Sequence, residues 1–197
     1  MKKIAVIGSG GSGKSTLSRK LGEKLSIEVF HLDAILWKPD WEAVAKDQQQ
    51  LIQHQLVAKD RWIIDGNYNG TLDIRLKAAD CIIFMDIPRS LCLYRVIMRT
   101  FRHRRQPRPD MATGCEERFN FNFLKWVWNY PTDKRPEVMN KLERLRGQKE
   151  IIILKSPKEA QLFLENIKTR APSLFHNSSG SRFLFVYCDL PHATGVT

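Results

Sequence analysis

The segment GSGGSGKS, residues 8–15, constrains the fold more than any other part of the chain. Its spacing fits G-x-x-x-x-G-K-[ST], the P-loop. Small side chains let successive backbone N–H groups turn inward around a phosphate, and a following helix adds the partial positive charge of its N-terminus. An apolar run, residues 4–7, precedes the motif, and residues 14–25 have helical spacing. We therefore expect a strand, a phosphate-binding loop and a helix here.

The motif predicts a role for each of its residues. Lys14 would reach the β- and γ-phosphates of a nucleotide, and the Ser15 hydroxyl would ligate Mg²⁺. The nucleotide that we expect is ATP. The other nucleotide-binding residues predicted from the loop and the first helical turn are Gly8, Ser9, Gly10, Gly11, Ser12, Gly13 and Thr16.

The same glycines permit a second interpretation. Gly8, Gly10 and Gly13 also fit G-x-G-x-x-G, the dinucleotide fingerprint. That motif requires an acid about twenty residues later, and Asp33 stands there. A dinucleotide loop has no need of a Lys-Ser pair directly after its last glycine. The presence of this pair favours the P-loop.

Strands and helices alternate along the rest of the chain. Apolar runs predict further strands at residues 27–32, 61–65, 81–85 and 151–154. We expect a helix that is N-capped by Asp40 and runs to about Lys59, and another that begins near Glu116 and ends at Pro131. The alternation predicts an α/β fold: a five-stranded parallel sheet with helices on both faces.

Positive charge is concentrated in one segment. The net charge is +11, and six arginines with no acid among them lie between Arg95 and Arg108. Such a charge suggests an anionic partner, either nucleotide or nucleic acid. Arg95 and Arg99 are four residues apart and repel each other unless an anion lies between them. We expect both to contact phosphate, and we expect residues 100–118 to form an Arg-rich lid in which Arg104 is the catalytic contact.

Composition indicates a cytoplasmic protein without a membrane partner. No apolar run reaches the roughly 18 residues of a membrane-spanning helix, and the apolar stretch near the N-terminus is too short for a signal peptide. The four cysteines have no metal spacing, which favours reduced thiols. We expect one domain, residues 1–170. Residues 171–197 form a tail that is either poorly ordered or adds an edge strand.

Several segments resemble the adenylate kinase-like nucleoside monophosphate kinases. Asp65-Gly66 in WIIDGNY resembles the strand end at which the family's Asp holds Mg²⁺ through water. FMDIP at 84–88, followed by Arg95-x-x-x-Arg99, resembles the fourth strand, its Asp-x-Pro turn and the arginines beside the adenine and phosphates. Together with HLDAILWKPDW and the arginine-rich run, these segments are similar to the bacterial topology modulation proteins, over residues 1 to about 168.

The resemblance is incomplete at the acceptor side. The family's Gly-x-Pro-Arg after the third strand is missing; Asn67 and Tyr68 occupy its place, and Arg75 matches its arginine poorly. The lid's Arg-x-Asp-Asp is also missing. In shikimate- and gluconate-type kinases an Asp after the second strand orients a substrate hydroxyl, and Asp33 stands in a similar place.

These features predict a P-loop kinase that passes the γ-phosphate of Mg-ATP to a nucleotide, nucleoside or other hydroxyl compound. The predicted catalytic residues are Lys14, Asp33, Arg99 and Arg104, and the predicted metal ligands are Ser15 and Asp65. The alternative is a nucleotide-dependent DNA-binding protein that modulates DNA topology through its arginine run. No helix-turn-helix or zinc-finger pattern supports this alternative.

Overall fold

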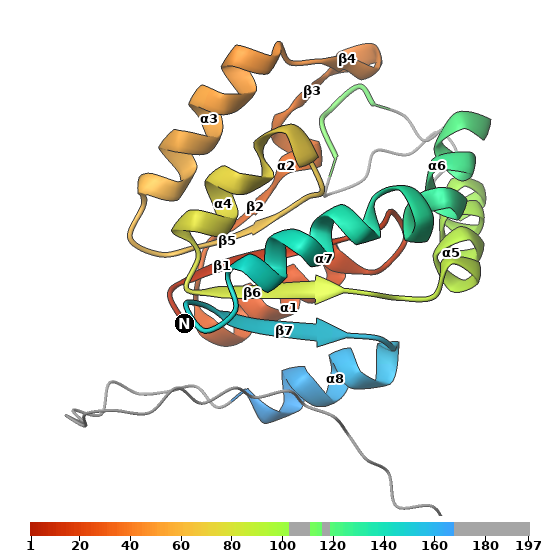
Figure 1. Cartoon of the computed structure of the whole chain (residues 1–197). Helices are drawn as coiled ribbons and strands as arrows, with labels where there is room; N and C mark the ends of the chain where they lie inside the picture. The colour runs from red at the N-terminus through yellow and green to blue at the C-terminus, as the bar shows by residue number, and fades with distance from the viewer. Residues whose placement is uncertain (103–110, 116–118, 168–197) are drawn as a thin grey trace, which may run out of the picture.

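The computed structural model describes residues 1–102, 111–115 and 119–167, and its centre is a five-stranded sheet (Figure 1). The strands follow the order β2-β5-β1-β6-β7, and all neighbours pair in parallel. They are β1 (Lys3–Gly8), β2 (Val29–His31), β5 (Trp62–Asp65), β6 (Cys81–Met85) and β7 (Glu150–Leu154). The predicted α/β fold with a parallel sheet is confirmed.

The two faces of the sheet are both apolar. Ile4 and Val6 of β1 belong to one buried cluster, and Ala5 and Ile7 belong to the cluster on the opposite face. Side chains alternate along a strand, so a strand that is buried on both faces is a continuous apolar run. Residues 4–7 form such a run, and all four are fully buried.

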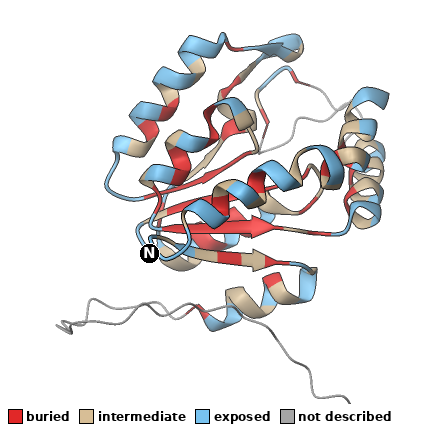
Figure 2. Ribbon diagram, in the orientation of Figure 1, coloured by how far each residue is buried: buried red, intermediate tan, exposed pale blue. Residues whose placement is uncertain are grey.

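Helices cover both faces (Figures 1 and 2). The clusters place α1 (Lys14–Leu25) and α8 (Pro157–Asn166) on one face, and α3 (Lys46–Ala58), α4 (Leu72–Ala78) and α7 (Arg135–Arg144) on the other. The helices α5 (Arg89–Arg102) and α6 (Phe121–Asp133) pack against each other beside the carboxyl ends of the strands. None of the helices within the described ranges is both long and apolar enough to cross a membrane.

The prediction that Asp40 caps a long helix is wrong. The helix α3 begins at Lys46, and the residues before it form a small antiparallel hairpin of β3 (Trp37–Lys38) and β4 (Glu42–Ala43), joined by the 3-10 turn η1 (Pro39–Trp41). Asp40 and Trp41 have φ angles of 61° and 62°. Asp40 lies in this turn, and the residue at the N-cap of α3 is Ala45.

The bounds predicted for the helix around Trp126 are also wrong. Asn120 caps α6 by accepting a 3.0 Å hydrogen bond from the Phe123 N–H, so the helix starts at Phe121. It continues through Pro131 to Asp133. Proline removes one backbone donor, but the Lys134 N–H still donates to the Tyr130 carbonyl at 3.0 Å and preserves the last turn.

Candidate active site

The loop between β1 and α1 depends on glycine. Gly11 has a φ of +76°, and a Cβ at this position would lie 2.3 Å from the carbonyl oxygen of Cys92 in α5. A Cβ on Gly10 would lie 2.6 Å from Cζ of Phe123 in α6. The loop therefore packs closely against both helices, and side chains would open this contact.

Lys14 begins α1 and folds back over the loop. Its Nζ donates a 2.8 Å hydrogen bond to the carbonyl oxygen of Ser9. Burial lowers the pKa of Lys14, while the carboxylates of Asp33 and Asp65 act in the opposite direction. The lysine, the loop and two acids from different strand ends thus converge, as the motif and the parallel sheet predict.

Asp65 lies at the end of β5 with one carboxylate oxygen engaged. Its Oδ1 is 2.9 Å from Nδ1 of His31, the residue beside it on β2. Its Oδ2 is buried and has no hydrogen-bond partner among the described residues. A buried carboxylate oxygen without a donor is suited to a cation or to a water that a cation holds.

A magnesium ion at this place would need phosphate oxygens and waters in addition to side chains of the protein. Nowhere in the described part of the chain do three or more His, Cys, Asp or Glu side chains gather as a metal site. Mg²⁺ usually takes one or two carboxylates together with phosphate oxygens and waters rather than an all-protein cage. Asp65 and the half-buried Ser15 satisfy that requirement.

A cavity of about 1120 Å³ lies beside the loop. It is lined by residues 10–16, by Arg95 and Arg99 of α5, and by Asp33 of the short helix α2 (Leu32–Ile35). The Nη1 of Arg95 donates to the carbonyl oxygen of Ser12 at 3.3 Å, which fixes this arginine against the loop. Further lining residues, which the sequence did not single out for this purpose, are Trp37, Trp41, Asn67, Tyr68 and Met111.

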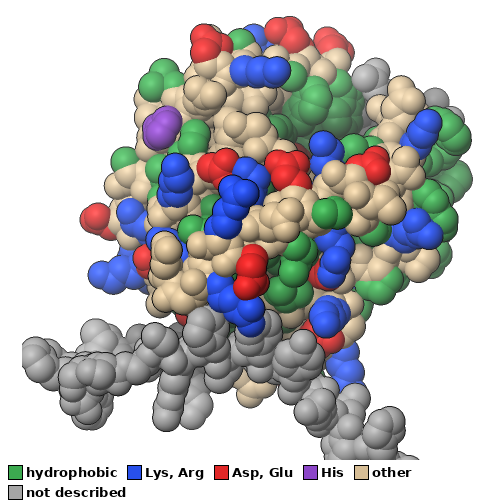
Figure 3. Space-filling model, in the orientation of Figure 1, with side chains coloured by type: hydrophobic (Ala, Val, Ile, Leu, Met, Phe, Trp, Pro, Cys, Tyr) green, Lys and Arg blue, Asp and Glu red, His purple; other side chains and the backbone are tan. Residues whose placement is uncertain are grey.

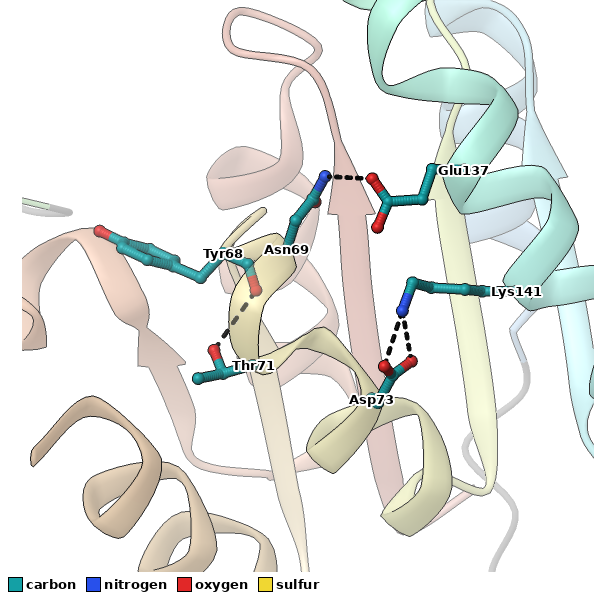
Figure 4. A network of polar contacts seen from close by, with 6 residues as sticks. All are labelled: Tyr68, Asn69, Thr71, Asp73, Glu137 and Lys141. Atoms are coloured by element: carbon teal, nitrogen blue, oxygen red, sulfur yellow. Dashed lines mark hydrogen bonds and ion pairs between the residues drawn. The ribbon is translucent and has the colours of Figure 1, made fainter. Parts of the chain in front are cut away.

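Tyr68 fixes the Asp33 carboxylate. The Tyr68 hydroxyl donates a 3.0 Å hydrogen bond to Asp33 Oδ1. Burial and the nearby Asp33 charge raise the pKa of Tyr68, so the phenol stays a neutral donor. The hydroxyl of Thr71 donates to the Tyr68 carbonyl at 3.3 Å, and the Tyr68 ring points away from this contact (Figure 4).

The helix α7 anchors the segment that carries Tyr68. The Nδ2 of Asn69, in the 3-10 turn η2 (Asn69–Thr71), donates to Glu137 at 3.4 Å. Lys141 donates to both carboxylate oxygens of Asp73, at 2.8 and 2.6 Å. In Figure 4 these contacts lie on the side of the turn opposite to the Tyr68 ring, so the backbone is held while the ring reaches the cavity.

Arg75 does not supply the cation that is missing from the acceptor side. It is fully buried and donates to the side chain of Gln53 and, at 3.2 Å, to the carbonyl of Gly66. Burial lowers the pKa of Arg75 to about 10. Arg75 therefore braces the turn after β5, and it is not among the residues that line the cavity.

Most of the predicted site residues that are described meet at one cavity. Those that line it are Gly10, Gly11, Ser12, Gly13, Lys14, Ser15, Thr16, Asp33, Arg95 and Arg99. Gly8, Ser9 and Asp65 are buried. Arg104, most of the predicted lid at 100–118 and the tail at 171–197 lie outside the described residues.

Sequence reasoning missed the roles of some aromatic residues. Phe119, Phe123 and Trp126 line the cavity, whereas Tyr130 is buried in the core. Trp37 contributes to the cavity from the unpredicted hairpin. The one available signal was position, because these residues follow the carboxyl ends of predicted strands or lie near the arginine run.

Comparisons with known proteins support the fold. No protein-family model matches the chain. It is similar to the uncharacterized protein YqaC of Bacillus subtilis (strain 168), with 26% identity over 131 residues that cover 66% of this chain and 72% of YqaC.

Two solved structures share its architecture. The shikimate kinase from Acinetobacter baumannii in complex with shikimate aligns with a TM-score of 0.54 and 15% identity, covering 85% of this chain and 90% of that one. The shikimate kinase from Bacteroides thetaiotaomicron aligns with a TM-score of 0.50 and 13% identity, covering 84% and 96%. The chain therefore has the α/β P-loop fold of the kinase type.

Proposed function

We propose that this protein is an ATP-dependent phosphotransferase that passes the γ-phosphate of ATP to a hydroxyl group of a small acceptor. One observation carries the proposal: a single cavity is lined both by the P-loop with Lys14 and by the Asp33 carboxylate. Phosphoryl transfer needs donor and acceptor groups held in line at close range, and little covalent help from the protein.

The donor side would neutralise phosphate charge. The backbone N–H groups of the loop and the N-terminus of α1 suit the phosphates of a nucleotide. Lys14, Arg95 and Arg99 would stabilise the negative charge on the transferring group. The contact between Arg95 and the Ser12 carbonyl supports this role, because it places the guanidinium beside the loop.

Ser15 and Asp65 would hold Mg²⁺ beside the phosphates. The ion would supply charge neutralisation at the phosphates. The contact of His31 with Asp65 Oδ1 leaves the second carboxylate oxygen, Oδ2, for this purpose.

Asp33 would serve the acceptor. As the acceptor oxygen forms its bond to phosphorus and ADP leaves, the hydroxyl proton would pass to the Asp33 carboxylate. Tyr68 would keep Oδ1 oriented so that the other oxygen faces the acceptor.

Transfer of labelled γ-phosphate from ATP tests the proposal. We expect Lys14→Ala to reduce transfer by at least about 100-fold, the scale of losing one charge-stabilising donor, while its circular dichroism stays unchanged. The control is Lys46→Ala, at the exposed start of α3. If Lys14→Ala transfers phosphate as well as the unmodified protein, the proposal fails.

The DNA-binding alternative gains no support from the described residues. Arg95 and Arg99, the first two arginines of the basic run, line the cavity. On the face drawn in Figure 3, basic side chains are interspersed with acidic ones. The resemblance to the topology modulation proteins stays a prediction.

A further inference from the structure

The cavity is lined by two chemically different sets of residues. The cations among its described lining residues come from α1 and α5: Lys14, Arg19, Lys20, Arg95 and Arg99. The elements α2, β3, η1 and the segment after β5 contribute Asp33, Trp37, Trp41, Asn67 and Tyr68. Among the described lining residues from these four elements, Asp33 carries the sole charge. We call Trp37, Trp41 and Tyr68 the aromatic wall.

The two tryptophans of the aromatic wall form one surface. Their ring centroids are 5.7 Å apart at an interplanar angle of 67°, which is an edge-to-face contact. A flat ring can stack on the face of one tryptophan and meet the other at its edge.

The backbone holds Trp41 in an unfavourable conformation. A φ of 62° is rare for a bulky residue, and Asp40 before it has a φ of 61°. Such conformations are costly and persist only where the surrounding structure holds them. The turn persists because the Asp40 N–H donates to the Gly114 carbonyl at 3.2 Å and the Cys115 thiol donates to the Lys38 carbonyl at 3.0 Å.

Among the residues that the structure describes, the charges near Asp33 disfavour an anionic acceptor. A phosphate or carboxylate beside Asp33 would be repelled unless a cation lay between them. Arg75 is buried and engaged with Gln53 and Gly66, and Lys38 of β3 pairs with Glu42 at 3.1 Å. Lys14 lies close enough to Asp33 to interact with it electrostatically, and the donor phosphates would occupy Lys14.

We propose that the acceptor is an uncharged alcohol that carries a planar ring, the chemistry of a nucleoside. Its ring stacks on the face of one of the two tryptophans, Trp37 or Trp41, and meets the other at its edge, and its hydroxyl lies at Asp33. The hydroxyl oxygen forms a bond to the γ-phosphorus, the bond to ADP breaks, and the proton passes to Asp33. This inference rests on the proposed phosphotransfer.

An acceptor panel with labelled ATP tests it. The panel contains adenosine, cytidine and thymidine, their 5′-monophosphates, shikimate and choline. We expect at least one nucleoside to be phosphorylated with a kcat/KM at least about tenfold above all charged compounds, the effect of about 1.4 kcal/mol. If a monophosphate, shikimate or choline is preferred, phosphotransfer stands and the ring proposal falls. If no compound accepts phosphate, the ring proposal falls, and if ATP also fails to bind, the proposed function falls with it.

A variant separates ring recognition from a general defect. Trp41→Leu should raise the KM for the nucleoside at least about tenfold, the scale of one lost aromatic stacking contact, and leave the KM for ATP within about twofold. The control is Trp128→Leu. Trp128 lies on α6, is 43% exposed, and has the Arg89 guanidinium over its ring. Equal effects of Trp41→Leu on both substrates, or none on either, would overturn the assignment of the wall to the acceptor.

Discussion

The Tyr68 hydroxyl donates a 3.0 Å hydrogen bond to Oδ1 of Asp33. This contact joins the segment after β5 to α2, and the two residues are 35 positions apart in the chain. Because burial and the nearby Asp33 charge raise the pKa of Tyr68, the phenol keeps its proton and remains a donor. The geometry of the proposed acceptor site therefore depends on a residue outside the P-loop motif.

Tyr68→Phe should lower kcat for phosphotransfer about tenfold and leave the KM for ATP unchanged. The variant removes a hydrogen bond to a charged group, worth about 1.5–3 kcal/mol, and lets the Asp33 carboxylate rotate. Steady-state kinetics with saturating ATP measure the effect. Tyr94→Phe is the matched control, because Tyr94 is exposed on α5. Equal activity of Tyr68→Phe and Tyr94→Phe would show that Asp33 needs no such support.

Gly11→Ala should weaken nucleotide binding and destabilise the fold. Its Cβ would lie 2.3 Å from the Cys92 carbonyl at a φ of +76°, so the loop or α5 must move. We expect a loss of about 2–4 kcal/mol in the free energy of unfolding and at least a tenfold weaker Kd for ATP. Urea unfolding and calorimetry measure the two effects. Gly70→Ala is the control, since a Cβ there meets no atom within 4 Å, and comparable losses in both variants would contradict the prediction.

Gln53→Ala should be strongly destabilising although glutamine is polar. Gln53 is fully buried, accepts from Arg75 and donates to Thr71. Its removal leaves the buried guanidinium short of an acceptor, and we expect a loss of about 2–4 kcal/mol in the free energy of unfolding.

Gln55→Ala, on the exposed side of the same helix, serves as the control for Gln53→Ala. Substitution at an exposed position should change the free energy of unfolding by less than about 0.5 kcal/mol. Urea unfolding of both variants decides the matter. A Gln53 variant as stable as the Gln55 variant would mean that Arg75 finds other acceptors.

Stability should fall as the pH rises above about 9. Burial raises the pKa of the Cys81 thiol above its ordinary value of 9.0, so the folded chain keeps a proton that the unfolded chain releases. The stabilisation is complete below the unfolded pKa and is lost at about 1.4 kcal/mol per pH unit above it. Cys92 acts in the same direction, whereas Lys14, whose pKa is lowered by burial, acts in the opposite one.

The pH effect is measured by urea unfolding at about pH 8 and about pH 10, on either side of the ordinary thiol pKa. Cys81→Val is the informative variant, because it removes one titrating group and keeps an apolar side chain in β6. Its free energy of unfolding should fall less steeply with pH than that of the unmodified protein. Parallel pH profiles would show that Cys81 does not contribute.

The sheet was predictable because its strands are buried on both faces. The predicted strand 81–85 matches β6 end to end, and the strand 61–65 differs from β5 by one residue. Local sequence is sufficient there, since a run of apolar residues fits no exposed element. The P-loop was predictable for another reason: its glycines and Lys14 are required by the backbone and the chemistry of phosphate binding.

The hairpin and the contacts around the site were not predictable from local sequence. Asp40 takes a left-handed conformation through its hydrogen bond to the Gly114 carbonyl, 74 residues further along the chain. His31 meets Asp65 only because β2 and β5 are neighbours in the sheet. Contacts of this kind depend on the order of the strands, which the periodicity of a single segment does not contain.

The central position of β1 determines when the site can form during synthesis. β1 is synthesised before both of its neighbours: it pairs with β5 on one side and with β6 on the other, and β6 ends at Met85. Until those residues emerge, the backbone N–H and C=O groups of β1 lack their partners. We expect a nascent chain truncated before Cys81 to bind no nucleotide, although it already contains the entire glycine loop.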